Sequence, residues 1–420
     1  MEEDISPKIY QPVNKLAEER LEKAIKEAEE ILEFEAAHDP ELLQALDIVK
    51  QYIRKKKLIC YGGTAMNALL PKKDKFYDLN YDLPDYDFFT YDVENDVKDL
   101  VTSLKAAGFK NIYKKMGIHE GTNKILVNYV AIADITQLHK DDFDILFKNS
   151  KKVDGVYYAN ENVLRMMMFL ELSRPRGEVE RWKKVYERLQ LMNKYFPTIP
   201  CKKKHHKKQI PEDIRKVLYE YIFDNQRVIA NIELEALYNK SLTSANVKFN
   251  TEIEGSTIII YSPDLKKDVR SLKSLLPEVS IVYYPQKGDF LANRISLVYE
   301  GIPVILLIEE TGCHSYNNVK TQKGHTIHIA SLETLITLHY SLYFFSKTEK
   351  TYLCAIGKCI KTFLALAISP ITMFDAFPVN CSGYQKGFPT LLREKLERSK
   401  KTPKKSSRTT RKNSTLKKNG

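Results

Sequence analysis

Two stretches of this chain, far apart in the sequence, repeat one pattern of side chains. The segment 85–108 (DYDFFTYDVENDVKDLVTSLKAAG) can be laid over the segment 257–280 (TIIIYSPDLKKDVRSLKSLLPEVS) without a gap. In each, a short apolar run typical of a strand precedes apolar residues at helical spacing. The matching positions include Asp92 and Asp264, Asp96 and Asp268, Leu100 and Leu272, and Leu104 and Leu276. We therefore predict that a strand–helix unit has been duplicated within the chain.

A second pair of segments extends this repeat. The segment 157–172 matches 328–342 with the offset changed by one residue, and each copy has a helical pattern. Helices are also expected at 13–37 and 40–56, with Pro40 at the first turn of the second. The alternation of strands and helices predicts a mixed α/β, or α+β, fold. We expect an N-terminal helical region followed by two tandem units, of which the second is degenerate.

The first unit should hold short strands at 58–61 and 86–91, with helices starting at Thr64 and spanning 94–107. Further strands are expected near 111–115 and over 125–136, and a helix should open after Tyr158. These patterns give four expected regions. They are an N-terminal helical region at 1–57, a first α/β unit at 58–200, a second at 201–392 and a tail at 393–420.

Charge is concentrated at the end of the chain. Of its 420 residues, the segment 398–420 holds ten basic residues and no acid, so removing it reduces the formal net charge from +12 to about +2. This segment has too few apolar residues to bury a core, and we expect it to be disordered. It could serve as a flexible arm for nucleic acid, or as a solubilising or targeting tail.

Other features bound the class of protein. We find no signal peptide, and the most apolar run, at 362–368, is too short to cross a bilayer, so a soluble protein is expected.

The six cysteines show no CxxC spacing, so neither a zinc ribbon nor a disulfide framework is favoured, and a reducing compartment fits best. The cysteines are Cys60, Cys201, Cys313, Cys354, Cys359 and Cys381.

Three elements of the first unit carry chemistry. Gly62-Gly63 links the strand at 58–61 to a helix, and such a turn exposes backbone N–H groups to a phosphate. Asp85 and Asp87 enter the next strand, where residues i and i+2 lie on one face, about 6.6 Å apart. The neighbouring strand places Asp134 among apolar residues, where an ionised carboxylate needs a cation or a partner. Each element alone is a weak signal, but their combination is specific.

The motifs GGTAMNALL, PDYDFF and VAIADITQL, in this order, resemble those of the nucleotidyltransferase superfamily. With the N-terminal helices and the degenerate second unit, the chain resembles the poly(A) polymerase catalytic subunits of poxviruses and giant DNA viruses. The resemblance covers roughly residues 40 to 380. One departure is the longer segment between Gly63 and Asp85, whose role it does not explain.

The resemblance implies a template-independent adenylyltransferase that adds AMP from ATP to RNA 3′ ends, as in mRNA polyadenylation. Asp85, Asp87 and Asp134 would bind two divalent ions, Mg²⁺ or Mn²⁺. The residues expected to bind the nucleotide are Gly62, Gly63, Thr64, Asn67 and Arg165. The partners implied are the RNA 3′ end and ATP, without a membrane, and with a second copy or a processivity-factor subunit left open. The resemblance also implies a viral protein of the host cytoplasm, the virus factory or the virion.

The second unit supports a catalytic role for the three acids. There Asp85 becomes Thr257, Asp87 becomes Ile259, Asp134 falls on Ile305 or Leu306, and the glycine pair has no counterpart. The copy keeps its apolar residues and loses every acid, so the fold does not require them. Two alternatives stay open. One is a related enzyme, such as an oligoadenylate synthetase or a uridylyltransferase, and the other is a non-catalytic RNA-binding scaffold.

Overall fold

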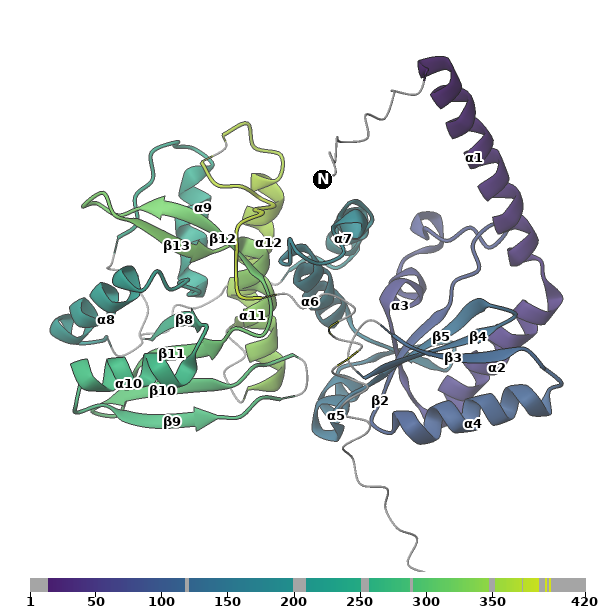
Figure 1. Ribbon diagram of the computed structural model, residues 1–420, viewed down its shortest axis with the longest axis horizontal. Coiled ribbons are helices and arrows are strands. Elements are labelled where there is room, and N and C mark those ends of the chain that lie inside the picture. The colour runs from purple at the N-terminus through teal and green to yellow at the C-terminus, as the bar shows by residue number, and fades with distance from the viewer. Residues whose placement is uncertain are drawn as a thin grey trace, which may run out of the picture.

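The computed structural model describes residues 14–117, 121–198, 209–250, 257–287, 290–346, 352–371 and 373–384, together with 390 and 393. The basic linker at 201–208 and the basic segment 398–420 lie outside these ranges. None of the helices in the described ranges has the length and apolar composition needed to cross a bilayer. The mixed α/β class predicted from the sequence is confirmed (Figure 1).

The first half of the chain is built on one seven-stranded sheet, with the strand order β3-β4-β5-β2-β1-β7-β6. Its strands are β1 (Ile59–Tyr61), β2 (Tyr86–Thr90), β3 (Ile112–Met116), β4 (Thr122–Val127), β5 (Val130–Gln137), β6 (Lys151–Val153) and β7 (Val156–Tyr158). Strands β2 and β5 are parallel, whereas β1 is antiparallel to β2. This order places the strands expected to carry the acids next to each other in the middle of the sheet.

Helices flank this sheet on both faces. They are α1 (Lys15–Ala37), α2 (Pro40–Lys56), α3 (Gly62–Leu69), α4 (Val93–Ala106), α5 (Lys140–Lys148), α6 (Glu161–Leu172) and α7 (Trp182–Tyr195), with 3₁₀ turns at Lys72–Asp74 and Val179–Arg181. Asp39 caps α2 by accepting hydrogen bonds from the backbone N–H groups of Glu41 and Leu42. This cap, with Pro40 in the first turn, confirms the predicted start of α2.

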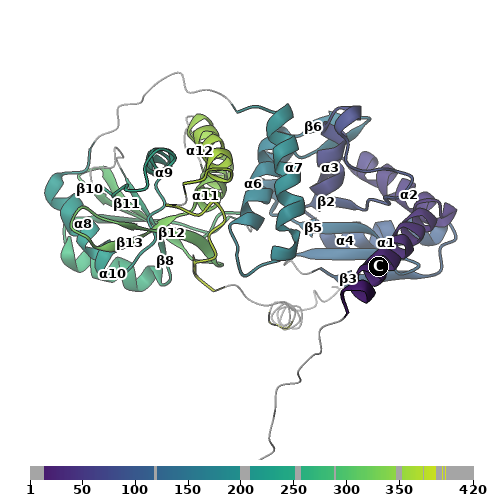
Figure 2. The ribbon, with the colours of Figure 1, turned by 90° about the horizontal axis from the view of Figure 1, so that it is seen from above.

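The second half contains a four-stranded sheet, β8-β11-β10-β9, and a three-stranded sheet, β13-β12-β14. The strands are β8 (Ile258–Ser262), β9 (Ser280–Tyr284), β10 (Arg294–Tyr299), β11 (Ile302–Glu309), β12 (His314–Lys320), β13 (Thr326–Ala330) and β14 (Cys381–Ser382). The helices are α8 (Glu212–Asp224), α9 (Glu235–Ser241), α10 (Leu265–Leu275), α11 (Leu332–Phe345) and α12 (Tyr352–Leu366), with a 3₁₀ turn at Ile232–Leu234. Helices α6, α7, α11 and α12 lie between the sheets of the two halves (Figure 2).

The duplication predicted from the sequence is visible in the buried contacts of Asp96 and Asp268. Asp96, at the start of α4, accepts hydrogen bonds from Tyr52 of α2, at 2.6 Å, and from Thr90. Asp268, at the start of α10, accepts hydrogen bonds from Tyr221 of α8, at 2.8 Å, and from Ser262, at 2.7 Å. In the first half, Asp96 therefore joins α4 to α2 and β2. In the second half, Asp268 joins α10 to α8 and β8 in the same way. The fold class with two related units is confirmed.

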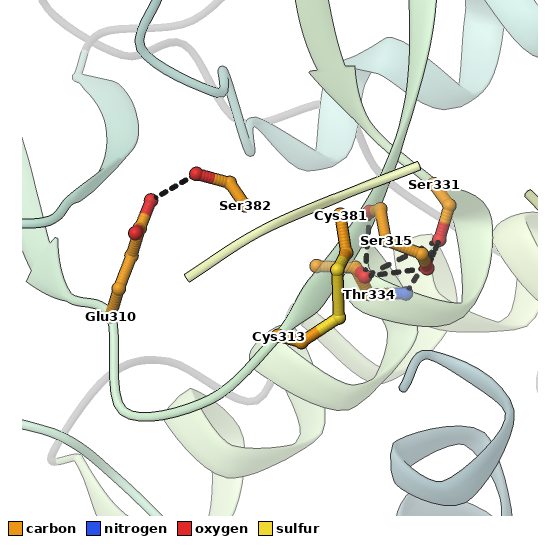
Figure 3. The surroundings of a disulfide bond; sticks show 7 residues. All are labelled: Glu310, Cys313, Ser315, Ser331, Thr334, Cys381 and Ser382. Atoms are coloured by element: carbon orange, nitrogen blue, oxygen red, sulfur yellow. Dashed lines mark hydrogen bonds between the residues drawn. A yellow bond between two sulfur atoms is a disulfide. The ribbon is translucent and has the colours of Figure 1, made fainter. Parts of the chain in front are cut away.

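Two sequence-based expectations were wrong. The single strand expected over 125–136 is a hairpin, because Asn128 and Tyr129 have φ values of 48° and 70° and reverse the chain between β4 and β5. The expectation of no disulfide was also wrong, since Cys313 and Cys381 are bonded (Figure 3). The two cysteines are 68 residues apart, and β12 meets β14 beside them through the pair Ser315–Cys381. Sequence spacing could not show this pairing.

Candidate active site

The three acids predicted from the sequence come together in the structure. Carboxylate oxygens of Asp85, Asp87 and Asp134 all lie within 4.8 Å of one another. The parallel pairing of β2 and β5 sets Asp87 directly opposite Asp134, and Asp85 stands just before β2. In the described part of the chain, this is the one such group of acids, histidines or cysteines.

Burial makes this cluster electrostatically unfavourable when it is empty of cations. Desolvation raises the pKa of Asp87, and the charges of Asp85 and Asp134 raise it further. Desolvation and the charge of Asp134 likewise raise the pKa of Asp85. The buried Oδ1 atom of Asp134 has no hydrogen-bond partner. Three crowded carboxylates with an unpaired buried oxygen suit a divalent cation, which takes oxygen ligands and removes the repulsion.

The glycine turn packs against this cluster. Strand β1 is antiparallel to β2 and pairs Tyr61 with Asp87, so the turn that follows β1 lies beside the acids. Gly62 has a φ of 69°, and a Cβ atom built on it would lie 2.2 Å from Asp87 Oδ2. Only glycine fits here, both for its backbone conformation and for its missing side chain. The N-terminus of α3 then starts next to the carboxylates.

The side chains of the next two residues predicted to bind the nucleotide hold neighbouring backbone. The hydroxyl of Thr64 donates a hydrogen bond to the carbonyl of Asp85, at 2.7 Å. The side-chain oxygen of Asn67 accepts from the backbone N–H groups of Phe76, at 2.9 Å, and Tyr77, at 3.3 Å. Thr64 therefore fixes the strand that carries the acids, and Asn67 fixes the long segment between Gly63 and that strand.

Arg165 lies away from the acids. The residue is buried, with only 1% of its surface exposed. The guanidinium donates to Asn193 and Asn162 at 2.8 and 3.2 Å, and to the carbonyls of Met192 and Phe196. These bonds tie α6 to the end of α7. The structure does not bring Arg165 to the acid cluster, and its guanidinium is occupied by these structural contacts.

Basic and aromatic residues near the acids were missed by sequence reasoning. Tyr77 and Arg188 lie against the second glycine, since a Cβ on Gly63 would be 2.1 Å from the Tyr77 hydroxyl and 3.0 Å from Arg188 Nη1. The Arg188 guanidinium also lies 4.5 Å from the ring centroid of Phe76. Burial lowers the pKa of Lys184, and the charges of Arg188 and Arg181 lower it further. These cations come from the start and middle of α7, where the sequence shows only an ordinary amphipathic helix.

The second unit has filled the equivalent position. The segment 228–230 takes the place of β1. Strand β1 is antiparallel to β2 and parallel to β7, and Ile229 likewise forms an antiparallel bridge with Ile260 and a parallel bridge with Ile329. The residue after this bridge segment is Asn231, where the first unit has Gly62. Its side chain donates to the carbonyl of Thr257 and accepts from the N–H of Ile259, both at 2.8 Å.

The same comparison resolves an alternative left open by the sequence. Ile259 pairs with Leu306 across parallel strands, as Asp87 pairs with Asp134, so Leu306 is the counterpart of Asp134. Thr257, Ile259 and Leu306 therefore stand where the first unit has its three carboxylates, and Asn231 stands in place of the glycine.

Comparison with known proteins places this site in a family. A family model described as "Poly(A) polymerase catalytic subunit" matches residues 47–178, the segment that holds the glycine turn and all three acids. Residues 47–178 are therefore similar to poly(A) polymerase catalytic subunits. The match confirms the resemblance drawn from the three sequence motifs.

Relatives of this family are found in large DNA viruses. A protein of Acanthamoeba polyphaga mimivirus, named as a poly(A) polymerase catalytic subunit, is 24% identical over 86% of this chain and 70% of its own length. A protein of the same name from African swine fever virus is 29% identical over 43% of this chain. That alignment covers 39% of the swine fever virus protein, so the chain spans well under two thirds of it.

A solved structure shares the fold of almost the whole chain. The crystal structure of the Megavirus polyadenylate synthase superposes with a TM-score of 0.72, at 22% sequence identity. The match covers 94% of this chain and 86% of the Megavirus chain. Both units and the helices between them therefore follow an arrangement already known from a giant-virus protein.

Proposed function

We propose that this chain is a viral poly(A) polymerase catalytic subunit, a template-independent enzyme that adds AMP from ATP to the 3′ end of RNA. The observation that carries the proposal is the group of Asp85, Asp87 and Asp134 beside the Gly62-Gly63 turn, within the segment that matches the family. The same segment without its acids, in the second unit, keeps its fold. The acids therefore serve chemistry rather than folding.

Asp85, Asp87 and Asp134 would hold the divalent ions, and we propose Mg²⁺ or Mn²⁺, two per site. When bound, such ions activate the attacking RNA 3′-hydroxyl and neutralise charge on the triphosphate. The protein's own contribution is to keep the carboxylates close and partly desolvated, so that they bind cations in preference to water. Thr64 supports this by fixing the backbone of Asp85.

The triphosphate of ATP would lie against the glycine turn and the positive side chains of α7. Gly62 and Gly63 leave the first turn of α3 open, and backbone N–H groups at a helix N-terminus favour phosphate. Lys184 and Arg181 supply positive charge near the acids, and Arg188 lies against Gly63. Burial, and then the charges of Arg188 and Arg181, lower the pKa of Lys184, and a polyanion would offset this repulsion. Tyr77, held by Arg188, would cover the second glycine.

Several finer points are part of this proposal. We propose the division of the chain into an N-terminal helical region at 1–57, a catalytic domain at 58–200, a degenerate domain at 201–392 and a basic tail at 393–420. RNA and ATP are the proposed substrates, and a second copy or a processivity factor is the proposed protein partner. We also propose a site of action in the host cytoplasm or the virus factory, and packaging in the virion; the viral relatives support a viral protein.

The experiment that tests the proposal measures which nucleotide is added and to what. The purified full-length chain is incubated with Mg²⁺ or Mn²⁺ and each labelled nucleoside triphosphate, with and without an unstructured RNA primer. We expect ATP to be added to the 3′ end of the primer and little addition without primer. Preferential addition of UTP would indicate a uridylyltransferase, primer-free oligoadenylates would indicate a synthetase, and no addition of any nucleotide would indicate a scaffold.

A further inference from the structure

A lysine lies inside the acid cluster, and no step of the proposed reaction uses it. Strand β4 pairs with β5 so that Lys124 stands directly opposite Asp134. The Lys124 ammonium is 2.6 Å from Asp134 Oδ2, while the side chains are 37% and 12% exposed. The ion pair is therefore held by the register of two central strands, and not by a flexible surface contact.

The influence of Lys124 extends to all three acids. Its charge lowers the pKa of Asp85 and of Asp87, against the stronger effect of their burial. Burial lowers the pKa of Lys124 itself, but the hydrogen bond and charge of Asp134, with the charges of the other two acids, outweigh burial and raise it. The ammonium thus acts electrostatically as a cation bound to the whole cluster.

We infer that Lys124 is a built-in cation that occupies the acid cluster of the metal-free protein and competes there with the divalent ion, so that this residue sets the affinity of the metal site. The inference rests on the proposed function, because it takes the three acids as metal ligands. Three ionised carboxylates together with the Lys124 ammonium carry a net charge of −2, which one divalent ion would neutralise. Without Lys124 the same three carboxylates would carry −3 and attract a divalent ion more strongly.

The arrangement gives two consequences for the chain's own residues. In the absence of metal, Lys124 keeps the carboxylates from repelling one another, so the cluster stays ordered between catalytic cycles. When a divalent ion binds, for example at the unpaired Oδ1 of Asp134, its positive charge repels the Lys124 ammonium and weakens the contact with Oδ2. Lys124 is in this sense a positioning residue for Asp134, not a catalytic residue.

The test is direct measurement of Mn²⁺ binding to the full-length chain without substrates, from the electron paramagnetic resonance signal of free Mn²⁺. We expect Lys124→Met to bind Mn²⁺ at least about tenfold more tightly than wild type, because a neighbouring positive charge has been removed. Lys124→Arg should stay near wild type, since it keeps the charge. Lys114→Met is the matched control, because Lys114 lies on the neighbouring strand β3 with its side chain exposed and should not affect binding.

A second readout checks that the effect is electrostatic. The rise in melting temperature between EDTA and saturating Mn²⁺ should be larger for Lys124→Met than for wild type, since tighter binding stabilises the folded state more. The role of Lys124 would be overturned, and the metal site kept, by two results together. Lys124→Met would bind Mn²⁺ no more tightly than wild type, and Asp87→Asn would abolish the binding seen in wild type. Absence of any Asp87-dependent Mn²⁺ binding in wild type would overturn the proposed metal site and this inference with it.

Discussion

Gly62 packs directly against Asp87: a Cβ atom on Gly62 would be 2.2 Å from Asp87 Oδ2. Gly62 directly follows β1, whose Tyr61 pairs with Asp87 of the antiparallel strand β2, so the sheet holds the glycine and the acid together. Gly-Gly turns are common in proteins, but here the carboxylate of Asp87, in the proposed metal site, requires glycine at position 62.

Gly62→Ala should therefore abolish nucleotide addition. The added methyl group would displace the Asp87 carboxylate, and the φ of 69° would add strain of about 1–2 kcal/mol. Gly301→Ala is the matched control, because Gly301 has a φ of 77° but no atom within 4 Å of the added Cβ. Both variants should lose similar stability in thermal unfolding, and only Gly62→Ala should lose AMP addition. Equal activity of the two variants would show that the glycine serves the turn alone.

The disulfide between Cys313 and Cys381 should contribute substantially to stability. A cross-link that closes a loop of 68 residues is worth about 4 kcal/mol in the chain-entropy treatment. Cys381→Ser should lower the free energy of unfolding by that order. Ser382→Ala, which removes only the hydrogen bond from Ser382 to Glu310 shown in Figure 3, should cost about 1 kcal/mol. Peptide mapping without reductant checks the bond itself, and free thiols at both positions would contradict it.

Glu333 should make stability depend on pH. It is fully buried in the first turn of α11, and burial raises its pKa from 4.5 to about 8. The folded state then holds this proton more tightly than the unfolded state. Its contribution is complete below about pH 4.5 and is lost, at about 1.4 kcal/mol per pH unit, as the pH rises towards 8.

Glu333→Gln cannot ionise, so its free energy of unfolding should fall less than that of wild type between pH 5 and pH 8. Urea unfolding at several pH values measures this difference, with Glu220→Gln, on an exposed position of α8, as the control. Parallel curves for Glu333→Gln and wild type would mean that Glu333 is ionised inside the folded protein.

Much of this arrangement could be predicted from the sequence, because its signals are local. The period of apolar residues predicted α2, α4 and α6, and the repeat with Asp96 and Asp268 predicted two related units. The loss of acids at Thr257 and Ile259 pointed to the catalytic unit. These predictions depend only on the spacing of residues along one strand or one helix, which the sequence shows directly.

What the sequence could not predict depends on contacts between distant strands. Lys124 and Asp134 meet because a two-residue turn folds β4 onto β5, and that turn uses Asn128 and Tyr129 with positive φ, not glycine. Asn231 stands in place of Gly62, but an insertion shifts the alignment of the two units there. The sequence therefore showed that the glycine pair is lost, and did not show which residue replaces Gly62. The bond between Cys313 and Cys381 likewise depends on which strand pairs with β12.

The most direct test of the account compares AMP addition by wild type and Asp87→Asn, with Asp141→Asn as the control on an exposed position of α5. The measurement is incorporation of labelled ATP into an RNA primer at saturating Mg²⁺, with thermal unfolding in EDTA for each protein. We predict that Asp87→Asn loses more than about 100-fold in rate, because metal ligands supply several kcal/mol of transition-state stabilisation. Its melting temperature in EDTA should equal or exceed that of wild type, since one of three crowded charges is gone, and Asp141→Asn should match wild type in both. Near-wild-type addition of AMP by a folded Asp87→Asn protein would contradict the account.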